Sequence, residues 1–201
     1  MSKRALALIG VIVFAVVIAG CANQKAPAEA AIASAETAFG AIQAEAAKYL
    51  PDQAKGVSDS LAAAKDAVAK GDYKVALETA QALPAKITAL TSAIAAKKAE
   101  LTTAWNGLSA MLPKAVDAIQ SRVGMLSKSK ALPKGLDKAK FEEAKAGLSE
   151  MTATWGQATS AFSAGDLTAA VASAETVKSK AASVMGLLNM QVPPALQAPA
   201  K

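Results

Sequence analysis

Apolar residues recur every three or four positions along most of this 201-residue chain. That spacing places them on one face of an α-helix, whereas a half-buried strand alternates apolar and polar residues. No stretch shows such an alternation bounded by hairpin turns. The spacing therefore predicts an all-α fold. Two of the clearest stripes are Ile32, Ala35, Phe39, Ile42, Ala46 and Tyr49, and later Phe141, Ala144, Leu148, Met151, Trp155, Ala158 and Phe162.

Prolines interrupt the helical stripes at several points. Proline lacks an N–H and crowds the preceding turn, so it starts helices well and continues them badly. Pro51 is expected to begin a helix, Pro84 to kink or break one, and Pro113 to mark a joint. We expect the Pro-rich residues 191–201 to form a disordered tail.

Gly-Asp pairs mark two further breaks, at Gly71-Asp72 and Gly165-Asp166. Glycine closes a helix in the left-handed conformation, and aspartate is a good N-cap for the next helix. The predicted architecture is an elongated bundle of about six helices. It is divided into two tandem three-helix units, 31–112 and 113–190.

The two units have similar breaks, because each combines a Gly-Asp pair with an upstream Leu-Pro pair, Leu50-Pro51 or Leu132-Pro133. The register is imperfect, since the two kinds of pair repeat at different offsets. Duplication is one interpretation, and the shared alanine-rich composition is the other. The Gly-Asp-Tyr motif also occurs in tetratricopeptide repeats, but the 34-residue period of those repeats is not apparent in this sequence.

Small residues dominate the stripes, and only 4% of the chain is aromatic. Alanine favours helix but buries little apolar area, so we expect a slim bundle of long helices. The heptad spacing of the few large side chains predicts that they anchor the core, with a ligand cage as the alternative. They are Phe39, Tyr49, Tyr73, Trp105, Phe141, Trp155 and Phe162.

The N-terminus has the features of a targeting segment. Lys3 and Arg4 precede an apolar run over residues 5–20, which ends at Cys21, the single cysteine of the chain. The run is short for a membrane-spanning helix, which needs about 20 apolar residues. This pattern favours a cleaved signal peptide over residues 1–20, followed by a polar tether over 21–30.

The residues before the cysteine, Ile18-Ala19-Gly20-Cys21, resemble the lipobox of bacterial lipoproteins. The resemblance implies cleavage between Gly20 and Cys21, thioether lipidation of Cys21 and acylation of the new N-terminus. Ordinary signal cleavage and an uncleaved anchor are the alternatives. Because Ala22 rather than aspartate follows the cysteine, the resemblance implies the outer membrane, facing the periplasm, if the host is Gram-negative.

The first half of the remaining chain resembles a family of alanine-rich helical domains of unknown function in bacterial envelope lipoproteins. The resemblance rests on Pro51, on Leu61-Ala64-Ala67, and on Gly71-Asp72-Tyr73 with Ala76. It implies a helical fold in the cell envelope and supplies no catalytic residue.

The composition argues against an enzyme. Histidine is absent, which removes the commonest general base and metal ligand, and one cysteine forms neither an intramolecular disulfide nor a metal cluster. The only paired-carboxylate candidates are Glu142, Glu143 and Glu150, which lie among lysines as on a solvated helix face. We therefore expect no catalytic residue, metal or cofactor.

The charge pattern is mildly basic. Removal of residues 1–20 takes away two basic and no acidic residues, so the net charge falls from +6 to +4. Five lysines are clustered near Pro133. One interpretation is a solvated basic loop, and the other is a surface that contacts anionic lipid, lipopolysaccharide or wall polymer. The chain lacks the clustered arginines and aromatics of a nucleic-acid groove. The five are Lys128, Lys130, Lys134, Lys138 and Lys140.

Together these features predict a non-enzymatic, lipid-anchored envelope protein. Its helices would act as a spacer, scaffold or partner-binding module, with the membrane, an envelope protein or the cell wall as partner. The alternative is a periplasmic carrier or adaptor that holds an apolar or anionic small ligand between its helices.

Overall fold

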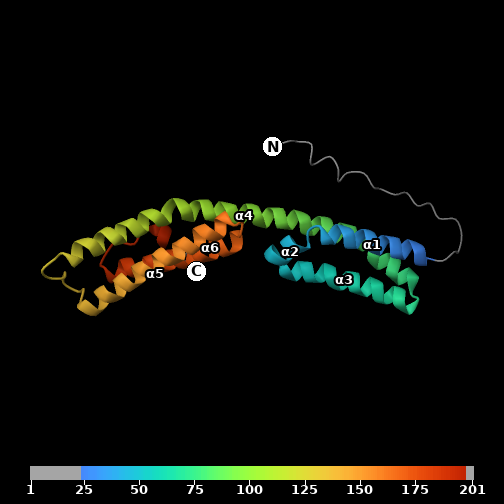
Figure 1. Ribbon diagram of the computed structural model, residues 1–201, viewed down its shortest axis with the longest axis horizontal. Helices are drawn as coiled ribbons and strands as arrows, with labels where there is room; N and C mark the ends of the chain where they lie inside the picture. Colours follow the sequence, from blue (N-terminus) through green and yellow to red (C-terminus); the bar gives the residue numbers. More distant parts are fainter. Residues whose placement is uncertain (1–23, 198–201) are drawn as a thin grey trace, which may run out of the picture.

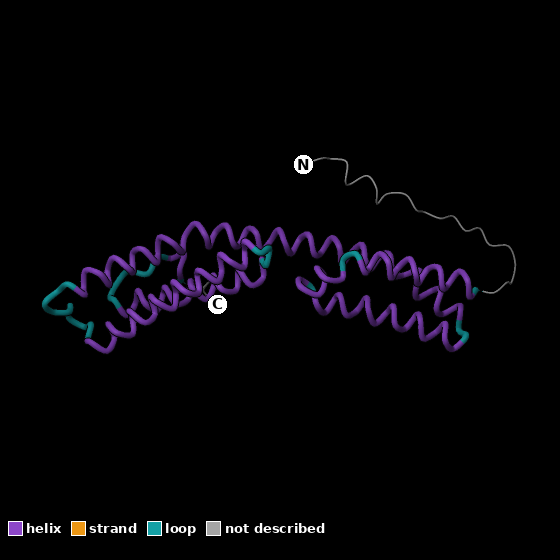
Figure 2. The backbone as a smooth tube through the Cα atoms, in the orientation of Figure 1, coloured by secondary structure: helices purple, strands orange, loops and turns teal. Residues whose placement is uncertain are grey.

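The computed structural model describes residues 24–197, which form six α-helices and one short 3-10 helix, with no strand among them (Figures 1 and 2). The predicted all-α fold with about six helices is confirmed. The elements are α1 (Lys25–Gly40), α2 (Gln43–Tyr49), α3 (Pro51–Lys70), α4 (Tyr73–Ser127), α5 (Lys138–Ser163), α6 (Leu167–Leu187) and η1 (Pro194–Leu196).

Helix α4 runs along the length of the elongated molecule (Figure 1). It has 55 residues, and at 1.5 Å per residue it is about 80 Å long. Helices α1, α2 and α3 pack against its first part, and α5 and α6 pack against its second part. One continuous helix is thus shared by two three-helix units.

The buried core divides between Leu101 and Trp105, not at the predicted boundary of 112 and 113. Leu101 closes the core of the first unit, which contains Phe39, Leu61 and Leu83. Trp105 opens the core of the second unit, together with Leu112. The two units also meet at Val171 of α6, which packs against both cores.

Neither Pro84 nor Pro113 ends a helix, so the predicted joint at Pro113 is wrong. A proline inside a helix costs about 3 kcal/mol. The residue before each proline, Leu83 and Leu112, is completely buried. Burying such a leucine contributes about 1.5–3 kcal/mol, and the partner helices bury further α4 residues on both sides of each proline. Tertiary packing therefore outweighs the local penalty.

Both Gly-Asp pairs lie between helices, as predicted. Gly71 and Gly165 have φ angles of +82° and +75°, which only glycine adopts without strain. Asp166 caps α6 by accepting a hydrogen bond from the Ala169 N–H at 3.2 Å. Asp72 occupies the predicted N-cap position of α4, but its side chain makes no capping hydrogen bond.

Both ends of the described chain are more ordered than the sequence suggests. The predicted tether extends to residue 30, yet α1 begins at Lys25, because Ala28 is fully buried against Ala67 and Ala76. The predicted tail begins at 191, yet η1 inserts Leu196 into the second core with 2% of its surface exposed. The prolines prevent a long helix there without preventing packing.

Helices α5 and α6 approach each other closely at Gly147. A Cβ atom added there would lie 2.6 Å from Cγ2 of Val184, whose β-branched side chain has little freedom to move. We expect Gly147→Ala to lower the free energy of unfolding by about 1–2 kcal/mol, because overpacking exceeds the gain in helix propensity.

The matched control is Gly156→Ala in the same helix, where nothing lies within 4 Å. It should raise stability by roughly 0.5–1 kcal/mol, and Val184→Ala should offset part of the Gly147→Ala defect. Urea unfolding measures all three, and equal effects of the two glycine substitutions would contradict the close approach.

Candidate functional site

The predicted lipidation site, Cys21, and the predicted cleavage position after Gly20 lie outside the described residues. The described chain starts beside the turn between α3 and α4, because Ala28 of α1 packs on Ala67 and Ala76. Within residues 24–197, none of the helices is long and apolar enough to cross a membrane.

The five predicted surface lysines occupy the loop between α4 and α5 and the first turn of α5. All five are exposed. We call residues 128–140 the lysine tip. Its backbone is fixed by Leu136, which is buried in the second core, and by Asp137, whose carboxylate accepts a hydrogen bond from the Lys140 N–H at 2.8 Å.

The lysine tip differs from the rest of the surface in its lack of ion pairs. Eleven of the 18 lysines between residues 24 and 197 form an ion pair. The seven that form none with a described residue are Lys86, Lys114 and the five of the tip. The tip therefore concentrates positive charge that no described carboxylate neutralises through an ion pair.

The carboxylates considered from the sequence do not form a paired site. Glu142 pairs with Lys145 at 2.7 Å, whereas Glu150 pairs with Lys180 of α6. No group of three or more potential metal ligands exists among residues 24–197. All three carboxylates are exposed, and Glu142 and Glu150 are ion-pair partners of lysines.

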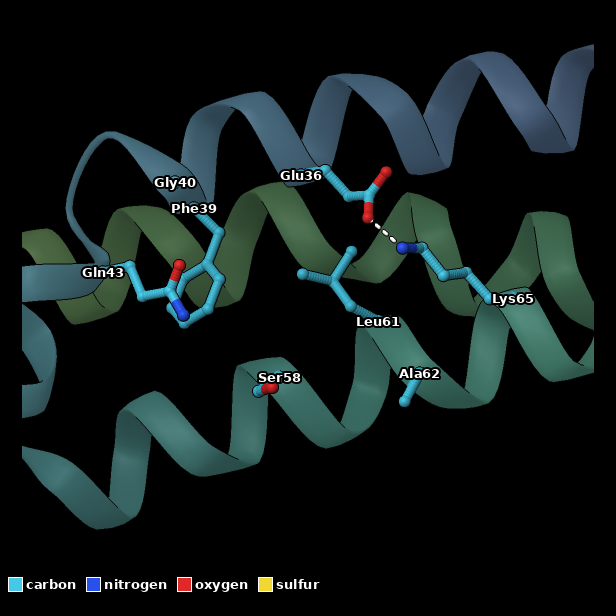
Figure 3. A pocket seen from close by; sticks show the side chains of 8 residues that line it. All are labelled: Glu36, Phe39, Gly40, Gln43, Ser58, Leu61, Ala62 and Lys65. Carbon is cyan, nitrogen blue, oxygen red and sulfur yellow. Dashed lines mark ion pairs between the residues drawn. The ribbon is translucent and has the colours of Figure 1, made fainter.

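A cavity of about 280 Å³ lies between α1 and α3 (Figure 3). Phe39, Gln43 and Leu61 line it, and an ion pair between Glu36 and Lys65 joins the two helices beside it. Those two side chains are its only titratable groups. The ion pair fastens α1 to α3 beside the cavity.

A larger cavity, of about 580 Å³, lies where the two units meet. We call it the seam cavity. Its lining comes from α2, from α4, and from the end of α5 and the start of α6 with the turn between them. Most of the lining surface is apolar, and Glu45, Lys48 and Lys98 are its charged residues. Across it, the Tyr49 hydroxyl donates to the Gly165 carbonyl at 3.4 Å, and Lys48 pairs with Asp166 at 3.3 Å. These contacts connect the first unit to the second.

Aromatic rings stack beside the seam cavity. The Trp105 ring lies parallel to Phe162 at 4.5 Å and to Trp155 at 5.5 Å between centroids. Trp105 is buried, as the sequence predicts, but Phe162 is 37% exposed and lines the cavity. The seam cavity could not be predicted from local sequence patterns, because it depends on contacts between distant residues such as Tyr49 and Gly165, which are 116 positions apart.

A third cavity, of about 380 Å³, lies between α4, α6 and η1. Its lining is almost entirely apolar and includes Met111, Met185 and Leu196. Lys114 is its one charged residue. It is the space left where the C-terminal segment folds back on the bundle.

Asp166 joins a helix cap to the contact between units. The Ala169 N–H, and then the Lys48 ammonium, hold the pKa of the Asp166 carboxyl below its ordinary value. A lowered pKa means that its stabilisation is present above the unfolded-state pKa and is lost as pH falls through the folded-state pKa. The contribution therefore disappears in acid and not in base.

We expect Asp166→Ala to cost about 1 kcal/mol, chiefly through the lost cap, because the partly exposed ion pair adds little. Asp166→Asn should retain most of the cap. Asp137→Ala, which removes the α5 cap without an ion pair, is the control. Urea unfolding at pH 7 and pH 3 measures the effect, and an Asp166→Ala defect of unchanged size at pH 3 would contradict this assignment.

Comparison with protein-family models, curated proteins and solved structures finds no match for the chain.

Proposed function

We propose that the chain is a non-enzymatic, lipid-anchored protein of the bacterial cell envelope, whose helical body acts as a spacer or scaffold. The lipobox resemblance at Ile18-Ala19-Gly20-Cys21 supports the anchor. Two or three acyl chains, each CH₂ contributing about 0.8 kcal/mol, hold a protein durably on a bilayer. The outer membrane is the proposed location in a Gram-negative host.

The observation that carries the spacer function is the course of α4. Lys25 begins α1 at the end of the molecule where α4 also begins, and the lysine tip follows the other end of α4. Cys21 is four residues from Lys25, a reach of at most about 14 Å. An anchor at Cys21 would therefore attach one end of a body about 80 Å long.

Mass spectrometry of the N-terminal peptide from native membranes tests the anchor. The proposal requires a chain that starts at Cys21 and carries a thioether-linked diacylglycerol. A bare thiol at Cys21, or a chain that retains residues 1–20, would contradict it.

The seam cavity favours a second candidate function, a carrier for an apolar or anionic small ligand. Its apolar lining and exposed Phe162 lie beside Trp105, so an occupant would change tryptophan fluorescence. Titration with a fatty acid distinguishes the two functions: a saturable change that Phe162→Ala weakens supports a carrier, and an unchanged signal supports the spacer alone.

A further inference from the structure

The lysine tip carries the entire charge imbalance of the chain after residue 20. Residues 122–145 contain seven basic and three acidic residues. The rest of that chain contains 13 of each. Two of the three acids are also engaged, because Asp137 caps α5 and Glu142 pairs with Lys145. The rest of the chain after residue 20 therefore has no net charge, and the excess positive charge lies in the segment that contains the tip.

We propose that the lysine tip docks on an anionic phospholipid bilayer other than the one that holds the N-terminal anchor. That the tip binds an anionic bilayer is inferred from the tip alone. That this bilayer is a second one rests on the proposed anchor at Cys21. Clusters of four to eight basic residues bind anionic headgroups through charge, and each lysine near such a surface strengthens binding about fivefold.

The side chains of the tip favour a bilayer over other polyanions. Residues 128–140 contain lysine but no arginine, hence point charges without the planar fork that grips individual phosphates or carboxylates. The only aromatic residue between 122 and 145 is Phe141, which is buried. Stacking on nucleic-acid bases would need exposed rings, and the tip offers none.

Met125 adds an apolar contact at the same end. It lies in the last turn of α4 with 59% of its surface exposed, and its carbonyl accepts a hydrogen bond from the Ser129 hydroxyl at 3.1 Å. A flexible thioether side chain three residues before Lys128 suits the boundary between headgroups and acyl chains.

The geometry separates the tip from the anchor. About 80 Å of α4 lies between the end at which α1 begins and the end that carries the tip. The described helices between them are stabilised by two continuous cores. If α4 stands perpendicular to the anchoring membrane, the tip lies about 80 Å from that membrane and faces a second surface. The elongated shape therefore suits a bridge between two bilayers.

Vesicle binding by residues 22–201, which include both cores, tests the tip itself. Vesicles contain 30% phosphatidylglycerol in phosphatidylcholine, or phosphatidylcholine alone. We expect sedimentation with the anionic vesicles only, declining steeply as salt is raised. A tip variant in which all five lysines are replaced by glutamine should bind on the order of a thousandfold more weakly. The five are Lys128, Lys130, Lys134, Lys138 and Lys140.

The matched control places glutamine at Lys55, Lys70, Lys74, Lys86 and Lys114, five exposed lysines outside the tip. It changes the net charge equally and should retain most of the binding. Circular dichroism checks that both variants remain helical. Equal losses in the two variants, equal binding to neutral vesicles, or binding to isolated cell wall but not to vesicles would overturn the assignment.

A two-vesicle experiment tests bridging and does not depend on native lipidation. Residues 21–201 are coupled through the Cys21 thiol to maleimide lipid in phosphatidylcholine vesicles, and anionic vesicles are then added. Light scattering should show clustering, which the tip variant abolishes and the control variant preserves. Sedimentation without clustering would overturn the second-bilayer inference. A bare Cys21 in native protein would overturn the proposed anchor and with it the choice of a second bilayer, but not the binding of the tip to anionic lipid.

Discussion

Cys21→Ser is expected to abolish incorporation of radiolabelled palmitate and to leave the protein unprocessed or released from the membrane. The serine hydroxyl forms no thioether, so the step that precedes cleavage in lipobox-bearing proteins is blocked. A single acyl chain gives only marginal binding, so partial modification elsewhere would not restore a durable anchor. Palmitate labelling, followed by separation of soluble and membrane fractions, measures the effect.

Lys25→Gln, close to the cysteine in sequence, is the control and should leave labelling unchanged. Recovery of the Cys21→Ser protein in the membrane pellet at the processed size would contradict the lipid anchor. It would favour ordinary signal cleavage with attachment through another part of the chain.

Thr103→Pro is expected to lower the free energy of unfolding by about 3 kcal/mol and to introduce a hinge between the two units. The substitution removes the Thr103 N–H from the α4 hydrogen-bond ladder and crowds the preceding turn. Leu101 and Trp105 belong to different cores, and Thr102 and Thr103 between them are exposed. Little packing therefore holds α4 straight at this point.

Thr103→Ala keeps the helix and loses only the hydroxyl bond to the Ala99 carbonyl, so we expect a change within about 0.5 kcal/mol. Urea unfolding measures stability, and small-angle X-ray scattering measures the maximum dimension. An unchanged scattering profile for Thr103→Pro would show that the seam contacts alone align the units.

Much of the fold follows from local sequence patterns. The stripe from Phe141 to Phe162 identified α5, and the Gly71 and Gly165 turns marked two of the helix ends. These features are predictable because helix periodicity and left-handed glycine act within a few residues.

The course of α4 was less predictable, because it depends on distant packing. The penalty at Pro113 is local and visible in the sequence, whereas the burial of Leu112 against α5 and α6 is not. The boundary between the units was therefore placed several residues too late. The same limitation hid the buried position of Leu196 within a proline-rich segment.

Surface features are likewise predictable where they are local in sequence and not where they depend on distant contacts. The five lysines of the tip are close in sequence, so their clustering was predictable. That they form no ion pair with a described carboxylate became apparent only from the structure, in which lysines elsewhere pair with distant carboxylates, such as Lys98 with Glu45 and Lys48 with Asp166. The seam cavity depends on similarly remote contacts.

The most direct test of the spacer is a distance measured along α4. Spin labels on cysteines at Lys74 and Ser121 of residues 22–201, two exposed positions of α4, report that distance by double electron–electron resonance. We expect one narrow peak at about 70 Å, the length of 47 helical residues. A broad distribution, or a peak below about 50 Å, would contradict a continuous α4 and with it the spacer function.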